Sequence, residues 1–197
     1  MLHLSRSGII SGAGGGIGAT LFEDTFTDTD ATALTDHTPD TGIGWTNVVA
    51  SGGQSIVSNA LKSASGTWPK WICDDTAADC TISSSAMYHA GSSDNPGIIF
   101  RYVDSANYWY TYVDNGGIYL SSVVGGSVDV NDYNDSLGSN NATARKMDIT
   151  LNGTSIKVWV DDTLLFNITN SSHLTSVKHG VTFYSTDAWI ADFKVAE

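Results

Sequence analysis

The hydrophobic pattern of residues 97–124 restricts the fold more than any other stretch of this 197-residue sequence. Three runs of β-branched and aromatic residues, Ile98–Tyr102, Tyr108–Val113 and Ile118–Val124, are typical of β-strands. Between them, Asp104–Asn107 and Asp114–Gly117 consist of residues that favour tight turns. The pattern therefore predicts three consecutive antiparallel strands joined by two short turns.

The middle run carries large side chains on both of its faces. Successive residues of a strand point to opposite faces, so the run divides into two sets of three residues. One set is Tyr108, Tyr110 and Tyr112, and the other is Trp109, Thr111 and Val113. Because both sets are bulky, we expect both faces of this sheet to be covered, as in a β-sandwich.

The charge balance points to a loop-rich chain and excludes some partners. The net charge is −12, and the acidic residues are almost all Asp, since Glu occurs only at Glu23 and Glu197. Asp favours turns and loops, whereas Glu favours helices, so few helices are expected. Phosphate backbones and anionic lipid would repel so acidic a chain, and we expect neither a nucleic-acid nor a membrane partner.

The rest of the sequence also has the pattern of an all-β domain. About thirteen short strands are expected from Leu21 onward, separated by turns rich in Gly, Ser and Asp. A second meander is expected over Met147–Asn152, Ser155–Val160 and Leu164–Thr169. The polar stretch Gly125–Ala144 is interpreted as the longest loop of the domain.

Residues 1–20 form a separate Gly-rich segment before the predicted sandwich domain of residues 21–197. The segment is too short to bury its own apolar side chains, which are Leu2, Leu4, Ile9, Ile10 and Ile17. We therefore predict an extended arm that orders against another subunit and acts as an assembly anchor. Arg6 and Gly8 interrupt its apolar run, so the segment does not have the pattern of a secretory signal.

The sequence offers little for metal or redox chemistry. Cys73 and Cys80 can form a local disulfide or remain free thiols, and free thiols are favoured. No cofactor is expected. Calcium is left open, because Asp129–Asp135 and the group Asp74, Asp75 and Asp79 supply the oxygen ligands that calcium prefers, but a solvated acidic loop is the favoured interpretation.

Several stretches resemble the concanavalin A-like, laminin-G-like jelly roll. The stretches that carry the resemblance are Gly97–Trp109, Ile156–Phe166, Gly180–Tyr184 and Ala191–Val195, and the resemblance covers roughly residues 22–196. It implies a jelly-roll β-sandwich of two antiparallel sheets. It also implies that the first strand pairs with the last, here Asp24–Phe26 with Asp192–Lys194.

The stretch Asp24–Asp30, together with Gly44 and Trp45, most resembles versions of this domain in bacteriophage structural proteins of the tail and capsid surface. That resemblance implies a non-catalytic accessory protein on the virion surface, such as a capsid decoration, fibre or tail component. Such a protein would be made in the host cytoplasm and would bind other virion proteins or copies of itself.

An alternative function is the recognition of a cell-surface glycan. Sugar rings stack on Tyr and Trp side chains, and the candidate residues for such contacts are Tyr108, Tyr110, Tyr112 and Trp159. The competing interpretation is that these rings pack the sandwich or a neighbouring subunit. Catalysis is not expected, because no pair of carboxylates lies in the Glu-x-Asp-x-x-Glu pattern of a glycosidase of this fold.

Overall fold

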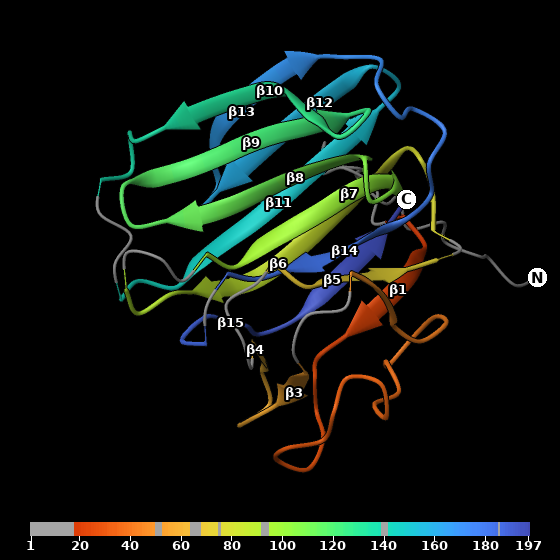
Figure 1. Cartoon of the computed structure of the whole chain (residues 1–197), viewed down its shortest axis with the longest axis vertical. Coiled ribbons are helices and arrows are strands. Elements are labelled where there is room, and N and C mark those ends of the chain that lie inside the picture. The colour runs from red at the N-terminus through yellow and green to blue at the C-terminus, as the bar shows by residue number, and fades with distance from the viewer. Residues whose placement is uncertain are drawn as a thin grey trace, which may run out of the picture.

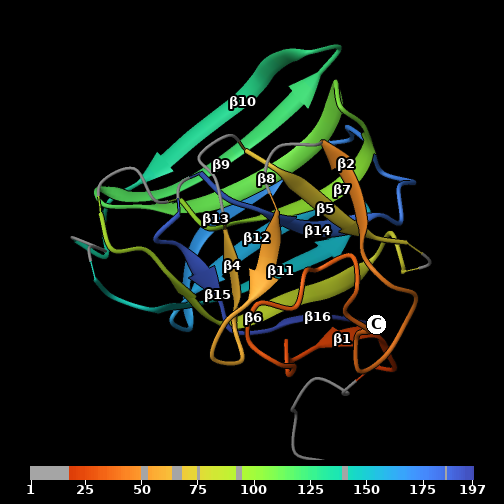
Figure 2. The same cartoon turned by 60° about the horizontal axis from the view of Figure 1, so that its bottom comes forward.

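Two antiparallel β-sheets packed face to face make up the molecule (Figures 1 and 2). The computed structural model describes residues 18–49, 53–63, 68–74, 76–91, 95–138, 142–184 and 186–197. Sixteen strands lie in these ranges, and no described residue is in an α-helix. The described part of the chain accordingly holds no helix that is long and apolar enough to cross a membrane. The predicted all-β sandwich is confirmed.

The predicted meander forms one half of a seven-stranded sheet. In spatial order the strands are β10 (Ser127–Asn134), β9 (Gly117–Val124), β8 (Asn107–Asp114), β7 (Gly97–Asp104), β14 (His179–Thr182), β5 (Lys70–Cys73) and β2 (Thr46–Val49). Both predicted turns are present, since β7 ends at Asp104 and β8 ends at Asp114. This half of the sheet is the green layer of Figure 2.

The loop predicted over Gly125–Ala144 is wrong in its first half. Gly125 and Gly126 have φ angles of +59° and +82°, which favour glycine, and they turn the chain back along β9. Strand β10 then follows. It is polar because it lies at the sheet edge and is largely exposed, so its sequence lacks the apolar alternation of a covered strand.

The opposite layer is a nine-stranded sheet. Its main path runs through β13 (Thr163–Thr169), β12 (Ser155–Val160), β11 (Arg145–Asn152), β6 (Cys80–Tyr88), β15 (Trp189–Ile190), β4 (Leu61–Ser63) and β3 (Gln54–Ile56). Strand β16 (Phe193–Ala196) also pairs with β6, and β1 (Thr20–Asp24) pairs with β16.

Alternating side chains from both sheets fill the space between the layers. Trp109 and Val113 of β8 are fully buried there, and so are Val158 and Val160 of β12. The ring of Trp109 stacks on that of Phe100, with 5.9 Å between centroids. The face of β8 that carries Trp109 is thus the core face, and the tyrosines of the same strand point to the outer side of the sheet.

The first and last strands pair, as the resemblance implied. Asp24 lies opposite Phe193 in an antiparallel ladder, and the rings of Phe22 and Phe193 are 6.0 Å apart. Phe26 was expected in the same ladder, but β1 ends at Asp24 and Phe26 has a φ of +49°. Phe26 is instead buried beside Trp45, so Phe22 is the residue of β1 that packs against Phe193.

The predicted arm lies almost entirely outside the described residues. Its anchor residues Leu2, Leu4, Ile9, Ile10 and Ile17 fall within 1–17. Thr20 already pairs with Ala196, so the last residue of the predicted arm belongs to the sandwich.

Both cysteines are free and buried. Burial raises the pKa of the Cys80 thiol to about 12, with smaller contributions from nearby charges, so this thiol is unreactive at neutral pH.

Candidate functional site

A row of tyrosines crosses three strands on the outer side of the seven-stranded sheet. The two-residue turn Asn115–Gly116 places Tyr112 of β8 opposite Tyr119 of β9. In the next ladder Tyr119 lies opposite Tyr133 of β10. Directly opposed residues share one face of a sheet, so these rings form a cross-strand row.

The rings of this row contact one another closely. Tyr112 and Tyr119 stack with centroids 4.7 Å apart and planes 10° apart. Tyr110 and Tyr112 stack at 5.9 Å, and Tyr119 and Tyr133 lie 4.7 Å apart. Such pairs contribute about 0.5–1.5 kcal/mol each beyond the area they bury, so each ring holds its neighbour in place.

Trp68 extends the row at the strand β5 side. Its ring lies 5.4 Å from Tyr112 and stacks on Tyr184 at 5.2 Å. The connected rings of this surface, here called the aromatic face, are Trp68, Tyr102, Tyr108, Tyr110, Tyr112, Tyr119, Tyr133 and Tyr184. Tyr102 is buried and Tyr133 and Tyr184 are exposed. The other five rings are half-buried, so each of these is packed along one side and reachable from the other.

A pocket of about 230 Å³ opens on the aromatic face. Its lining residues are Trp68, Lys70, Ile99, Tyr108, Tyr110 and Thr182. In the β14 ladders, Gly180 lies opposite Ile99 and Thr182 lies opposite Gly97. Because neither glycine has a side chain to fill this space, the outer side of the sheet stays open between β8 and β5.

Burial sets the protonation of the polar groups in and beside this pocket. It raises the pKa values of the Tyr108 and Tyr112 hydroxyls, with smaller contributions from neighbouring tyrosines. Both hydroxyls therefore keep their protons at neutral pH and can donate as well as accept hydrogen bonds. Burial also lowers the pKa of Lys70, whose Nζ lies 5.1 Å from the centre of the Tyr108 ring.

The structure brings together three of the four predicted sugar-binding residues. Tyr108, Tyr110 and Tyr112 are adjacent on the aromatic face. Trp159 is on β12, where its neighbours Val158 and Val160 fill the core, so its ring points to the outer side of the nine-stranded sheet. The four residues thus lie on opposite sides of the sandwich and do not form one site.

Sequence reasoning missed Tyr119, Trp68 and Lys70. Tyr119 had a usable signal, because counting outward from the Asp114–Gly117 turn along both strands places Tyr119 opposite Tyr112. Trp68 and Lys70 had none, because the pairing of β5 with β14 joins residues more than 100 positions apart, such as Lys70 and Thr182.

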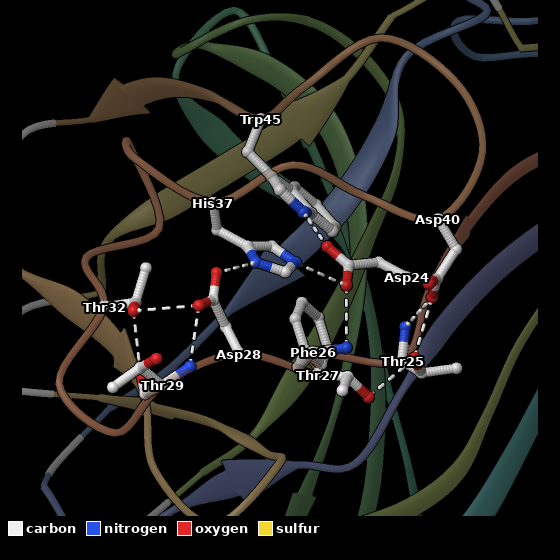
Figure 3. Close-up of polar contacts among 10 residues, drawn as sticks. All are labelled: Asp24, Thr25, Phe26, Thr27, Asp28, Thr29, Thr32, His37, Asp40 and Trp45. Carbon is white, nitrogen blue, oxygen red and sulfur yellow. Dashed lines mark hydrogen bonds and ion pairs between the residues drawn. The ribbon is translucent and has the colours of Figure 1, made fainter.

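A second cluster of polar groups lies at the end of β1 (Figure 3). The buried carboxylate of Asp24 accepts hydrogen bonds from the indole of Trp45 at 2.6 Å and from the amide of Phe26 at 2.7 Å. The His37 ring lies between Asp24 and Asp28, with its Nε2 2.9 Å from one carboxylate and its Nδ1 3.0 Å from the other. These bonds fix the long loop that follows β1.

The His37 cluster has the arrangement of a structural network. Burial alone would lower the pKa of His37, but the hydrogen bonds that the charged ring donates to Asp28 and Asp24 outweigh it and raise the pKa. In a Ser–His–Asp triad one ring nitrogen faces a carboxylate and the other faces the nucleophile. Here both nitrogens face carboxylates, so the imidazole has no free position at which to take a proton from a nucleophile.

A polar pocket on the outer side of the nine-stranded sheet also contains carboxylates. Glu23 pairs with Lys194 at 3.2 Å, and Asp148 pairs with Lys146 at 3.0 Å. Asp192 accepts a hydrogen bond from the amide of Ser85 at 2.7 Å, so each of these acids already has a partner in the folded chain.

The described residues of the two calcium stretches do not form a cluster of ligands. Asp129 and Asp132 are exposed on the edge strand β10, and Asp135 follows the end of that strand. Asp74 pairs with Lys178 at 3.2 Å, and Asp75 lies outside the described residues. Across the described ranges, no three His, Cys, Asp or Glu side chains are grouped so that they could hold a metal ion.

Solved structures of carbohydrate-active and carbohydrate-binding proteins share this fold. A carbohydrate-binding module, CBM66, from Bacillus subtilis is 16% identical over 76% of this chain and 94% of its own, with a TM-score of 0.61. The Bacillus licheniformis β-glucanase is 11% identical over 91% of this chain and 99% of its own, with a TM-score of 0.64. Sheep galectin-11, in complex with glycerol, is 9% identical over 64% of this chain and 96% of its own, with a TM-score of 0.52.

These likenesses define the class of fold, which is the concanavalin A-like jelly-roll β-sandwich expected from the sequence. No protein-family model matches the chain, and no curated protein matches its sequence. At such low identity the solved structures show the fold alone, since one fold hosts unrelated functions.

Proposed function

We propose that the aromatic face binds a glycan and that the chain acts as a carbohydrate-binding domain without catalysis. The observation that carries the proposal is the continuous row of fixed, half-buried rings beside a pocket. The apolar C–H faces of sugars stack on such rings, and the tyrosine hydroxyls supply hydrogen bonds to sugar hydroxyls.

The geometry favours affinity because the rings are already in position. Tyr112 is held on one side by Tyr110 and on the other by Tyr119, so little side-chain freedom remains to be lost on binding. A row that crosses β8, β9 and β10 fits an extended chain of sugar units better than a single sugar. The proposal therefore favours an oligosaccharide ligand.

Binding is proposed over cleavage because of the residues that line the pocket. Hydrolysis of a glycosidic bond needs two carboxyl groups, about 5–5.5 Å apart for retention or roughly 6.5–9.5 Å for inversion. The described lining of this pocket includes neither Asp nor Glu. The carboxylates of the polar pocket on the other sheet are held by Lys194, Lys146 and Ser85. The solved structures named above include both an enzyme and binding proteins, so the choice rests on these residues.

The virion role predicted from the sequence stays a prediction. A glycan-binding face is compatible with it, since an adhesin on a particle surface needs such a face. The proteins with a similar fold that are named above lend it no support.

A glycan array probed with the full chain tests the proposed function. We expect saturable binding to one class of oligosaccharide, which titration calorimetry then measures with the same sugar in solution. If the protein melts cooperatively but binds none of the glycans saturably, the proposal is contradicted.

A further inference from the structure

Among the described residues that line the pocket on the aromatic face, Lys70 is the one cation. Its ammonium lies over the ring of Tyr108, at 5.1 Å from the ring centre. The other lining residues are aromatic, aliphatic or hydroxyl-bearing. The ammonium of Lys70 therefore lies beside aromatic, aliphatic and hydroxyl-bearing side chains and not beside a carboxylate.

No described carboxylate forms an ion pair with Lys70, which distinguishes it from several other cations of the chain. Lys146, Lys178 and Lys194 each pair with Asp or Glu at 2.7–3.2 Å. This difference stands out in a protein with 21 acidic residues and a net charge of −12. The Tyr108 ring attracts the ammonium but does not neutralise it.

A partly buried cation without a counter-ion is costly, because burial removes water that would solvate the charge. That cost lowers the pKa of Lys70. A bound anion would offset this cost by accepting a charge-assisted hydrogen bond from Nζ. A neutral sugar hydroxyl would accept a weaker bond.

We infer that the ligand of the aromatic face is an acidic glycan, whose carboxylate or sulfate group pairs with Lys70 while a neighbouring sugar ring stacks on Tyr108 and Tyr110. The inference rests on the proposed glycan binding and adds the chemical class of the ligand. The strong negative charge of the whole chain would slow the approach of an anion, so selectivity comes from the local contact with Lys70 and not from long-range attraction.

The test uses two matched pairs of oligosaccharides with the full chain. One pair is an oligogalacturonide and its carboxyl-reduced, neutral counterpart, and the other is a sulfated oligogalactan and its desulfated counterpart. We expect one acidic member to bind roughly tenfold or more tightly than its neutral counterpart, and the pair that shows this identifies carboxylate or sulfate as the anion. Lys70→Gln should remove the preference, and Lys70→Arg should retain most of it.

Lys62→Gln is the matched control, because Lys62 is on β4 of the other sheet and should leave the preference unchanged. The inference is overturned if neutral members bind as tightly as acidic ones, or if Lys70→Gln keeps the preference while it melts like the parent. Binding of neutral glycans that Tyr112→Ala abolishes would leave the proposed function standing and remove only the acidic ligand. Absence of binding to any of the four sugars and to the wider array removes both.

Discussion

Tyr112 lies directly opposite Tyr119 in the β8–β9 ladder, and the two rings stack 4.7 Å apart. The tight turn at Asn115 and Gly116 sets this register, since a shift by one residue would move every side chain of the strand to the other face. This pair of rings is therefore a direct product of the local hairpin, and the sandwich beneath the hairpin supports both rings.

Phe193→Ala should lower the free energy of unfolding by about 3–5 kcal/mol, as expected for a fully buried aromatic ring. Phe193 has no exposed surface and contacts the rings of Phe22 and Trp45. Chemical denaturation measures the change. Leu164→Ala is the control, because Leu164 is 39% exposed and should change stability by no more than about 0.5 kcal/mol. A loss below about 1 kcal/mol for Phe193→Ala would count against the packing of the terminal strands.

Gly180→Ala should destabilise the seven-stranded sheet. A Cβ atom at this position would lie 1.9 Å from the backbone oxygen of Trp71, so β5 and β14 would have to separate. Overpacking of this kind costs about 1–3 kcal/mol or more. Gly53→Ala is the matched control, because a Cβ atom at that position has no atom within 4 Å. It should be neutral or slightly stabilising in the same thermal melts. Equal melting temperatures for the two variants would contradict the close approach of these strands.

The His37 network should make stability depend on pH. The pKa of His37 is raised in the folded chain, so its contribution is fully present below the ordinary value of 6.5 and is lost as the pH rises through the folded pKa. The pKa of Asp28 is lowered, chiefly by its hydrogen bond with His37, so its contribution is lost as the pH falls through the folded value.

Melting temperatures of the parent chain and of His37→Gln, measured from about pH 5 to pH 9, test the pH dependence expected for His37. We expect the advantage of the parent chain over the variant to shrink toward alkaline pH. A difference that stays constant over this range would mean that folding does not raise the pKa of His37.

Deletion of residues 2–17 should leave a cooperatively melting sandwich, because the ladder of β1 with β16 begins at Thr20. If the predicted arm is an assembly anchor, the truncated chain should no longer join particles or oligomers. Size-exclusion chromatography with light scattering compares the two chains. Assembly of the truncated chain to the same extent would show that the arm has no anchoring role.

Local patterns account for the parts of the fold that the sequence predicted. Alternation within Tyr108–Val113 separated the core face from the outer face, and the turn residues placed both hairpins. The pairing of the first and last strands followed from the family resemblance alone. Strand β10 was not predicted, because strands were recognised by apolar alternation and an exposed edge strand does not need it.

The candidate site was only half predictable for a related reason. Tyr108, Tyr110 and Tyr112 lie on one strand, so their period of two was enough to group them. Lys70 joins them only through the ladders that link β5 to β14 and β14 to β7, and no local pattern encodes such long-range order. In the same way, nothing in the spacing of Asp24, His37 and Trp45 revealed that they share one network.

The most direct test of the account is to titrate the glycan selected on the array into Tyr112→Ala and Trp159→Ala. Both changes remove a partly buried aromatic ring from a strand, but Tyr112 is on the aromatic face and Trp159 is on the opposite sheet. We expect Tyr112→Ala to weaken binding at least about tenfold in protein that still melts cooperatively, and Trp159→Ala to leave the affinity within about twofold of the parent. Unchanged affinity in Tyr112→Ala, or loss of binding in Trp159→Ala alone, would contradict a glycan site on the aromatic face.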